Sequence, residues 1–311
     1  MTTDVIDVVI CTRNRPSYLK TCVTDLLQSD FDKTILGKIY ILDSSDKPTL
    51  FNNLVTDLDF ISHVVQIPLQ STLSLPEKRN YFLKFYLNEE RIVLFLDDDV
   101  RIHHTALSEV GKLFRSLECI GVGGIDLAYE VDKPWVFLQK ILGSEISTPG
   151  RLLSSGRNIQ YFSTNTISRV DWLAGNFMAF RGDCLRGNLF DESRNFIGED
   201  VDFTFRMSQK GLLVASPDIL YRHLNYTNAS TIRYHRYADF IDHRTKLIHD
   251  FPKRVKFTST LLALVLEQSL NLLGSMKQFS ISNSFIELVR LLTLPFVFLQ
   301  KLLQNSQMWQ S

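Results

Sequence analysis

The feature that most restricts the fold of this chain is a regular alternation of short apolar runs, polar loops and helical segments. The apolar runs are rich in β-branched residues and lie at Val5–Cys11, Ile39–Leu42, Val64–Ile67 and Ile92–Leu96. Segments with helical spacing follow three of the runs, at Tyr18–Leu27, around Leu50–Leu58 and at Pro76–Leu87. Strands that alternate with helices in this way predict an α/β fold, with a mostly parallel sheet that helices cover on both faces.

Polar residues that directly follow the strands are the first candidates for a binding site. In open α/β sheets, ligands bind beyond the carboxyl ends of the strands. The residues at these places are Thr12–Arg15, Asp43–Asp46 and Asp97–Asp99. A less regular stretch from Tyr129 to Arg169 is expected to form loops around the site rather than a separate domain.

The charge balance and the cysteine content exclude several classes of function. Lys and Arg together number 34, as do Asp and Glu, so the formal net charge is zero and no nucleic-acid partner is expected. The four cysteines are scattered without a CxxC pair, which favours reduced thiols over a zinc site or a disulfide framework. The first residues lack the basic and apolar pattern of a signal peptide, so we expect a cytoplasmic protein.

Three adjacent carboxylates, Asp97, Asp98 and Asp99, end the apolar run Ile92–Leu96. Adjacent acids repel one another, and a divalent cation such as Mg²⁺ or Mn²⁺ would offset their charge. Asp97 and Asp99 point to the same side of an extended segment, which suits one to a metal and the other to a ribose. A solvated acidic turn explains the triplet equally well when it is taken alone.

A second acidic pair, Glu199 and Asp200, follows Gly198 at the start of a predicted helix. The first turn of a helix favours negative charge, and this position could direct a carboxylate into a site. For an isolated pair, plain helix capping is the simpler explanation. Asp202 and Arg206 have the i,i+4 spacing of an ion pair on one helix face.

Basic residues follow the first strand and begin a later helix. Thr12–Arg15 forms a basic, hydrogen-bonding loop, and Lys78–Asn80 supplies further positive charge. Arginine side chains fit phosphate oxygens, so a nucleotide diphosphate is a reasonable ligand.

Six motifs, taken in order, resemble the family 2 glycosyltransferases with the GT-A fold. The motifs are VVICTRNRP, ILDSSD, LPEKRN, FLDDDV, WLAGNFMAFR and GEDVDFTFR, and the resemblance covers Val5 to His223. Each motif alone is weak, and their order makes the resemblance specific.

The resemblance implies an inverting enzyme that uses Mg²⁺ or Mn²⁺ to transfer a hexosyl or deoxyhexosyl group. The donor would be a nucleotide-diphosphate sugar, and the acceptor a hydroxyl of a glycan or a lipid-linked molecule, in cell-envelope polysaccharide or glycoconjugate synthesis. The residues implied in nucleotide binding are Thr12, Arg13, Arg15, Asp43, Arg79, Asp97 and Asp98. The implied metal ligands are Asp99, Asp97 and His223. The implied general base is Asp200, and the residues that border donor sugar and acceptor are Trp172, Gly175, Asn176 and Glu199.

Two alternatives to a glycosyltransferase are a nucleotidyltransferase that acts on sugar phosphates and a catalytically inactive binding protein. The former normally has a glycine-rich phosphate loop after its first strand, and CTRNRP contains no glycine. The retained acidic motifs argue against the latter.

Leucine-rich helices fill the end of the chain, so we expect a catalytic domain at residues 1–257 and a helical extension at 258–311. Polar residues interrupt both apolar stretches, which argues against a membrane span. The helices could pack on the catalytic domain or on a second copy in a homo-oligomer. Alternatively, with Lys253, Arg254 and Lys256 in front of them, they could anchor the protein peripherally at the inner face of a membrane.

Overall fold

A computed structural model of the chain describes residues 5–29, 35–47, 63–129, 149–162, 164–194, 197–224, 237–277 and 281–307. The helix expected around Leu50–Leu58 lies outside these residues. By its contacts the chain divides into two compact units. The first unit is Met1–Arg151 with Ile159–Tyr226, and the second is Leu152–Asn158 with Thr227–Ser311.

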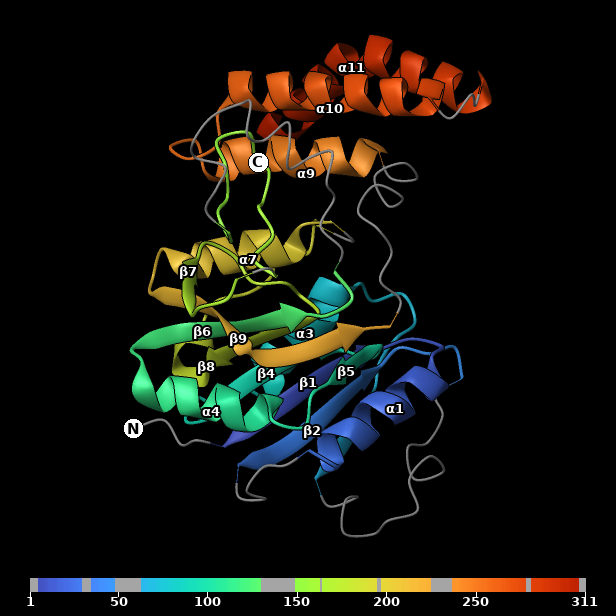
Figure 1. The fold of residues 1–311 in the computed structure, drawn as a ribbon. Helices are drawn as coiled ribbons and strands as arrows, with labels where there is room; N and C mark the ends of the chain where they lie inside the picture. Colours follow the sequence, from blue (N-terminus) through green and yellow to red (C-terminus); the bar gives the residue numbers. More distant parts are fainter. Residues whose placement is uncertain are drawn as a thin grey trace. The chain divides into compact units, whose positions relative to one another are not determined.

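The first unit contains the α/β fold (Figure 1). In chain order its elements are β1 (Ile6–Thr12), α1 (Pro16–Leu27), β2 (Leu36–Asp43), β3 (Val64–Pro68), α3 (Leu75–Phe85), β4 (Ile92–Asp97), β5 (Val100–Ile102), α4 (Ala106–Ser116), β6 (Cys119–Asp126), β7 (Ser168–Val170), β8 (Phe177–Arg181), α6 (Gly182–Leu185), α7 (Glu199–Ser208) and β9 (Leu212–His223). The strands and helices expected between Val5 and Leu87, and the strand that ends at Leu96, are confirmed where the structure describes them. Their observed ends differ from the predicted ones by only a few residues.

One sheet joins all of these strands, in the order β3-β2-β1-β4-β8-β6-β9-β5, with β7 paired to β9. Strands β1 to β4 are parallel, and the pairings of β6 and β9 give these two strands the same direction. Strand β8 runs the opposite way between β4 and β6, and β5 and β7 run opposite to β9. The mostly parallel sheet predicted from the sequence is therefore confirmed, with antiparallel strands added in its second half.

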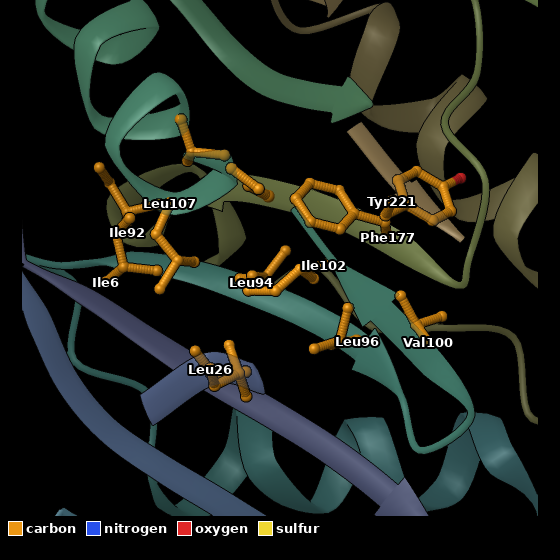
Figure 2. Close-up of a cluster of buried hydrophobic side chains, with 14 of the residues drawn as sticks. Ile6, Leu26, Ile92, Leu94, Leu96, Val100, Ile102, Leu107, Phe177 and Tyr221 are labelled. Atoms are coloured by element: carbon orange, nitrogen blue, oxygen red, sulfur yellow. The ribbon is translucent and has the colours of Figure 1, made fainter. Parts of the chain in front are cut away.

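The side chains of β1 and β4 alternate between two buried faces of the sheet, as extended strands require. On one face, Ile6, Ile92 and Leu94 pack with Leu26 of α1 and Leu107 of α4 (Figure 2). On the other face, aromatic rings from α3, β4, β8 and α7 pack edge-to-face and stacked. Helices cover both faces of these central strands, so their ends are the natural place for a ligand.

The second unit contains α9 (Tyr237–Asp250), α10 (Phe257–Lys277) and α11 (Ile281–Gln307). Ile241, Leu264, Leu294 and Phe298 form the buried cluster that holds these helices together. No helix within the described ranges is both long enough and apolar enough to cross a bilayer. The expected domain boundary at residue 257 remains a proposal, since the contact-based unit also includes α9.

Candidate active site

The acidic triplet lies at the end of β4, beside the end of β1 (Figure 1). The hydroxyl of Thr12 donates a hydrogen bond to Asp98 Oδ2 at 2.6 Å. Arg15 Nη1 lies 3.3 Å from Asp98 Oδ1 and 3.0 Å from Asp99 Oδ2. Because Asp98 and Asp99 are each only 4% exposed, the triplet is a structured part of the fold and not a solvated turn.

Strand pairing brings His223 to the same place. Val100 of β5 lies opposite His223 of β9, and His223 Nε2 lies 3.0 Å from Asp99 Oδ1. One ligand atom from each of Asp97, Asp99 and His223 lies within 4.8 Å of the others. Two carboxylates and an imidazole at this spacing fit a divalent cation that takes its remaining ligands from water and phosphate.

Asp126, at the end of β6, is a site residue that the sequence analysis missed. Its Oδ1 accepts a hydrogen bond from the backbone N–H of His223 at 3.1 Å and another from Ala128 at 2.9 Å. The residue is 2% exposed, and its carboxylate therefore fixes the backbone from which His223 projects. The signal that could have found it is the one used for the other strands, a polar residue that ends an apolar run.

Burial alters the protonation of these groups in the metal-free protein. It raises the pKa of Asp97 to about 6, against the opposing effect of the Arg79 charge. Burial alone would lower the pKa of His223, but the hydrogen bond to Asp99 and the nearby carboxylates raise it above its ordinary value. Metal binding at this cluster would therefore have to displace protons.

Arg79 is a buried cation of the site. Its side chain is 2% exposed, and the guanidinium lies 5.3 Å from the ring centre of Phe190. Its Nη2 donates to the carbonyl oxygen of Gly175 at 2.8 Å and lies 3.4 Å from Asp97 Oδ1. Its Nη1 lies 3.5 Å from Glu199 Oε1, so a single guanidinium neutralises one carboxylate from each acidic motif.

The second acidic motif begins α7, as predicted. Gly198 caps the helix with φ of 78°, a left-handed conformation that favours glycine. Asp200 Oδ2 accepts a hydrogen bond from Gly175 N at 3.0 Å, and its Oδ1 accepts one from Val201 N at 2.8 Å. Burial raises the pKa of Asp200, although these two N–H donors oppose the shift. Burial and the adjacent Asp200 charge also raise the pKa of Glu199.

Gly175 and Asn176 connect the two acidic motifs. The N–H of Gly175 bonds to Asp200, while the carbonyl oxygen of Asn176 accepts a hydrogen bond from Asp97 N at 3.2 Å. Tyr221 OH donates to the Asn176 side chain at 2.9 Å. A Cβ on Gly175 would lie 3.0 Å from the Cβ of Asp200, so a larger residue here would press on Asp200. The two acidic motifs therefore belong to one site.

The remaining predicted residues lie at different depths. Asp43 is buried at the end of β2, opposite Thr12 in the sheet register, and it accepts a hydrogen bond from Ser45 N. Arg13 is half exposed and lies 3.5 Å from Asp46. Trp172 is 2% exposed, and its indole N–H bonds to the carbonyl oxygen of Ile159. We therefore place Trp172 in the wall that supports the site, and its contact with a sugar stays a prediction.

The i,i+4 pair of α7 is also confirmed. Arg206 Nη2 lies 2.9 Å from Asp202 Oδ2. The pair stabilises α7 and does not contact the other residues of the site. A separate cavity of about 460 Å³ lies along β5 and β9. Its lining includes Arg101, His103 and Arg222 but none of the predicted site residues. The candidate active site is therefore identified by the contacts among its residues and not by this cavity.

Comparison with known proteins agrees with this geometry. The family described as Glycosyltransferase like family 2 matches residues 4–233. No curated protein sequence matches the chain.

Solved structures with a similar fold are glycosyltransferases. The mannosyltransferase PcManGT from Pyrobaculum calidifontis, in complex with GDP-Man and Mn²⁺, is 12% identical with a TM-score of 0.56, over 98% of this chain and 87% of that one. TarS of S. aureus is 16% identical with a TM-score of 0.53, over 90% of this chain and 54% of that one. GalNAc-T7 with UDP, GalNAc and Mn²⁺ is 15% identical with a TM-score of 0.54, over 79% of this chain and 47% of that one. The chain spans about half the length of TarS and of GalNAc-T7, and these likenesses show the GT-A fold.

Proposed function

The chain belongs to the glycosyltransferase-like family 2, and from this membership we propose that it is an inverting, metal-dependent enzyme that transfers a sugar from a nucleotide-diphosphate donor to a hydroxyl. One observation carries the proposal. The candidate metal ligands Asp97, Asp99 and His223 and the carboxylate of Asp200 meet through the backbone of Gly175 and Asn176. Donor phosphates and an acceptor hydroxyl can thus be held on either side of one anomeric carbon.

Asp200 is the proposed general base. It removes the proton from the acceptor hydroxyl as that oxygen bonds to the anomeric carbon, and the bond from this carbon to the diphosphate oxygen breaks on the opposite side. The configuration inverts in this single displacement. The raised pKa of Asp200 suits the role, because a carboxylate whose pKa lies closer to neutral pH accepts a proton more readily.

Groups that are already in place stabilise the negative charge on the departing diphosphate. Arg15 extends from the end of β1 toward the acidic triplet and is half exposed, so its remaining N–H groups can reach a phosphate. Asp97, Asp99 and His223 would hold Mg²⁺ or Mn²⁺, which supplies positive charge at the diphosphate oxygens. Arg79 is too deeply buried to reach solvent, so we assign it to holding Asp97 and Glu199 in position.

The proposed donor carries a hexosyl or deoxyhexosyl group, and the proposed acceptor is a hydroxyl of a glycan or a lipid-linked molecule in cell-envelope polysaccharide synthesis. The structurally similar enzymes were solved with GDP-Man or with UDP, so these two nucleotides are the first to test.

The experiment is a product assay on a panel of nucleotide sugars with Mn²⁺ or Mg²⁺. A glycosyltransferase releases nucleoside diphosphate, with slow release even when water replaces the acceptor. A nucleotidyltransferase that runs on the same sugars instead consumes pyrophosphate. Metal-dependent release of UDP or GDP supports the proposal, and turnover that requires pyrophosphate would refute it.

A further inference from the structure

Helices α10 and α11 of the second unit (Figure 1) carry many large apolar side chains that are exposed. On α11 these residues are Phe285, Ile286, Leu288, Val289, Leu292, Phe296, Leu299 and Leu303. Leu262, Leu273 and Met276 are exposed on α10. Single exposed leucines are common, but a continuous row along one helix marks an interaction surface.

Several polar residues of the same two helices face inward. Glu267 accepts hydrogen bonds from Arg244 of α9 at 2.8 and 3.0 Å. The side chain of Gln268 donates to the backbone carbonyl of Glu287 at 3.1 Å, and the side chain of Asn305 donates to Thr245 at 2.9 Å. The covered side therefore combines these polar contacts with the apolar cluster, while the exposed side is rich in large apolar side chains, unlike a helix on a water-facing surface.

The exposed row on α11 has the spacing of a helix-pairing seam. Six of its members are separated by alternating steps of four and three residues: Phe285, Val289, Leu292, Phe296, Leu299 and Leu303. This is the a/d pattern with which one helix packs against another. Pro295 lies inside α11 on the exposed side and leaves the row uninterrupted.

Charge along α11 favours a protein partner over a lipid surface, and the exposed Lys253 and Lys256 precede α10 rather than flank this row. Helices that lie on membranes carry cations beside their apolar face. On α11 the two cations with described side chains are only 21% and 31% exposed, and both are engaged in ion pairs, Arg290 with Glu287 and Lys301 with Asp242. The residues that flank the row, Thr293 and Gln300, are uncharged. Depletion of charge is typical of the centre of a protein interface.

The apolar area is also that of a protein interface. Eight half-exposed side chains on α11, at roughly 100 Å² each, give on the order of 800 Å² per copy, which is what a standard interface buries on each partner. The largest apolar patch of a typical monomer is about 300–600 Å².

We propose that this face of α11 joins a second copy of the same chain, so that the protein is a two-fold homodimer whose helices pack through the row from Phe285 to Leu303. A two-fold axis is the commonest symmetry of homo-oligomers and lets one self-complementary row serve both partners. The proposal does not depend on the reaction assigned to the first unit.

The test is sedimentation equilibrium of the full-length chain across a wide range of concentrations. We expect wild-type protein to approach twice the chain mass of 35.9 kDa. Phe296→Glu places a charge at the centre of the row, where the wild-type ring is 76% exposed, and should raise the dimer dissociation constant by about 100-fold or more. Phe85→Glu is the matched control, because this ring on α3 is 67% exposed and lies outside the row. It should leave the constant unchanged.

The outcomes that overturn the proposal are distinct. Wild-type protein that stays at the monomer mass, or forms assemblies of three or more copies, overturns it. So does Phe296→Glu with the wild-type constant. Co-sedimentation of a monomeric wild-type protein with phosphatidylcholine and phosphatidylglycerol vesicles would assign the face to lipid instead. If circular dichroism shows that Phe296→Glu does not fold, Leu292→Gln serves in its place, with the same expected direction.

Discussion

Replacement of Arg79 by methionine tests whether the two acidic motifs share a buried counter-ion. The substitution keeps a long apolar side chain against the rings of Phe95 and Phe190 but removes the positive charge. Asp97 and Glu199 would then lose the cation that now lies 3.4 and 3.5 Å from them. The 2.8 Å hydrogen bond from Arg79 to the carbonyl oxygen of Gly175 would also be lost.

The expected magnitude follows from burial. Removal of one partner from a buried ion pair costs about 3–5 kcal/mol, because the other charge is left uncompensated. Arg15 offers the matched control, since it also pairs with the acidic triplet but is 48% exposed. Water can replace part of the contact that the half-exposed Arg15 makes with these buried carboxylates, so Arg15→Met should lower the free energy of unfolding by less than Arg79→Met.

The assay is urea unfolding of wild type and both variants without added metal, at about pH 8 and about pH 5. Loss of the Arg79 charge raises the pKa of Asp97 further, and a protonated carboxyl no longer needs a counter-ion. The destabilisation should therefore be largest at pH 8 and smaller at pH 5. Equal losses for Arg79→Met and Arg15→Met, or a larger loss at pH 5, would refute the assignment of Arg79 as the buried counter-ion.

Three further predictions concern the reaction and the metal. Asp200→Asn should lower sugar transfer by about 10²–10⁴-fold while nucleotide affinity, measured by calorimetry, stays unchanged; transfer at the wild-type rate would rule out this base. Gly175→Ala places a methyl group 3.0 Å from the Cβ of Asp200 and 3.3 Å from Arg79 Nη1, so both the rate of nucleoside diphosphate release and the free energy of unfolding should fall. Gly111→Ala, with its nearest neighbour at 3.6 Å, should lower neither. Because the raised pKa of Asp97 keeps its proton up to about pH 6, Mn²⁺ competes with that proton in acid, and the rise in melting temperature caused by Mn²⁺ should grow as pH increases through 6. A metal effect independent of pH would contradict this ligand assignment.

Local patterns in the sequence were sufficient for much of the fold. The β-branched run before the acidic triplet specifies a buried strand because both faces of β4 are covered. Gly198 marks the start of α7 because it adopts a left-handed backbone conformation directly before the first helical residue. The same rule of polar residues after strands found Thr12, Asp43 and the triplet, and would also have found Asp126.

Contacts between distant segments could not be predicted in this way. His223 reaches Asp99 across 124 residues through the pairing of β5 with β9, and no local pattern specifies that register. The insertion of β8 between β4 and β6 places Asn176 beside Asp97, although β8 runs against its neighbours. The burial of Arg79 depends on aromatic rings from separate elements, so the sequence predicted a nucleotide-binding arginine without showing that its guanidinium contacts both acidic motifs.

We propose that Asp97, Asp99 and His223 hold a cation against the donor diphosphate, within reach of Asp200. The most direct measurement is anomalous diffraction at the manganese edge from crystals grown with Mn²⁺ and either UDP or GDP. We expect one strong peak in direct contact with a carboxylate oxygen of Asp99, with the nucleotide phosphates bound to the same ion. A manganese peak at other carboxylates, or a nucleotide bound away from the acidic triplet, would contradict it.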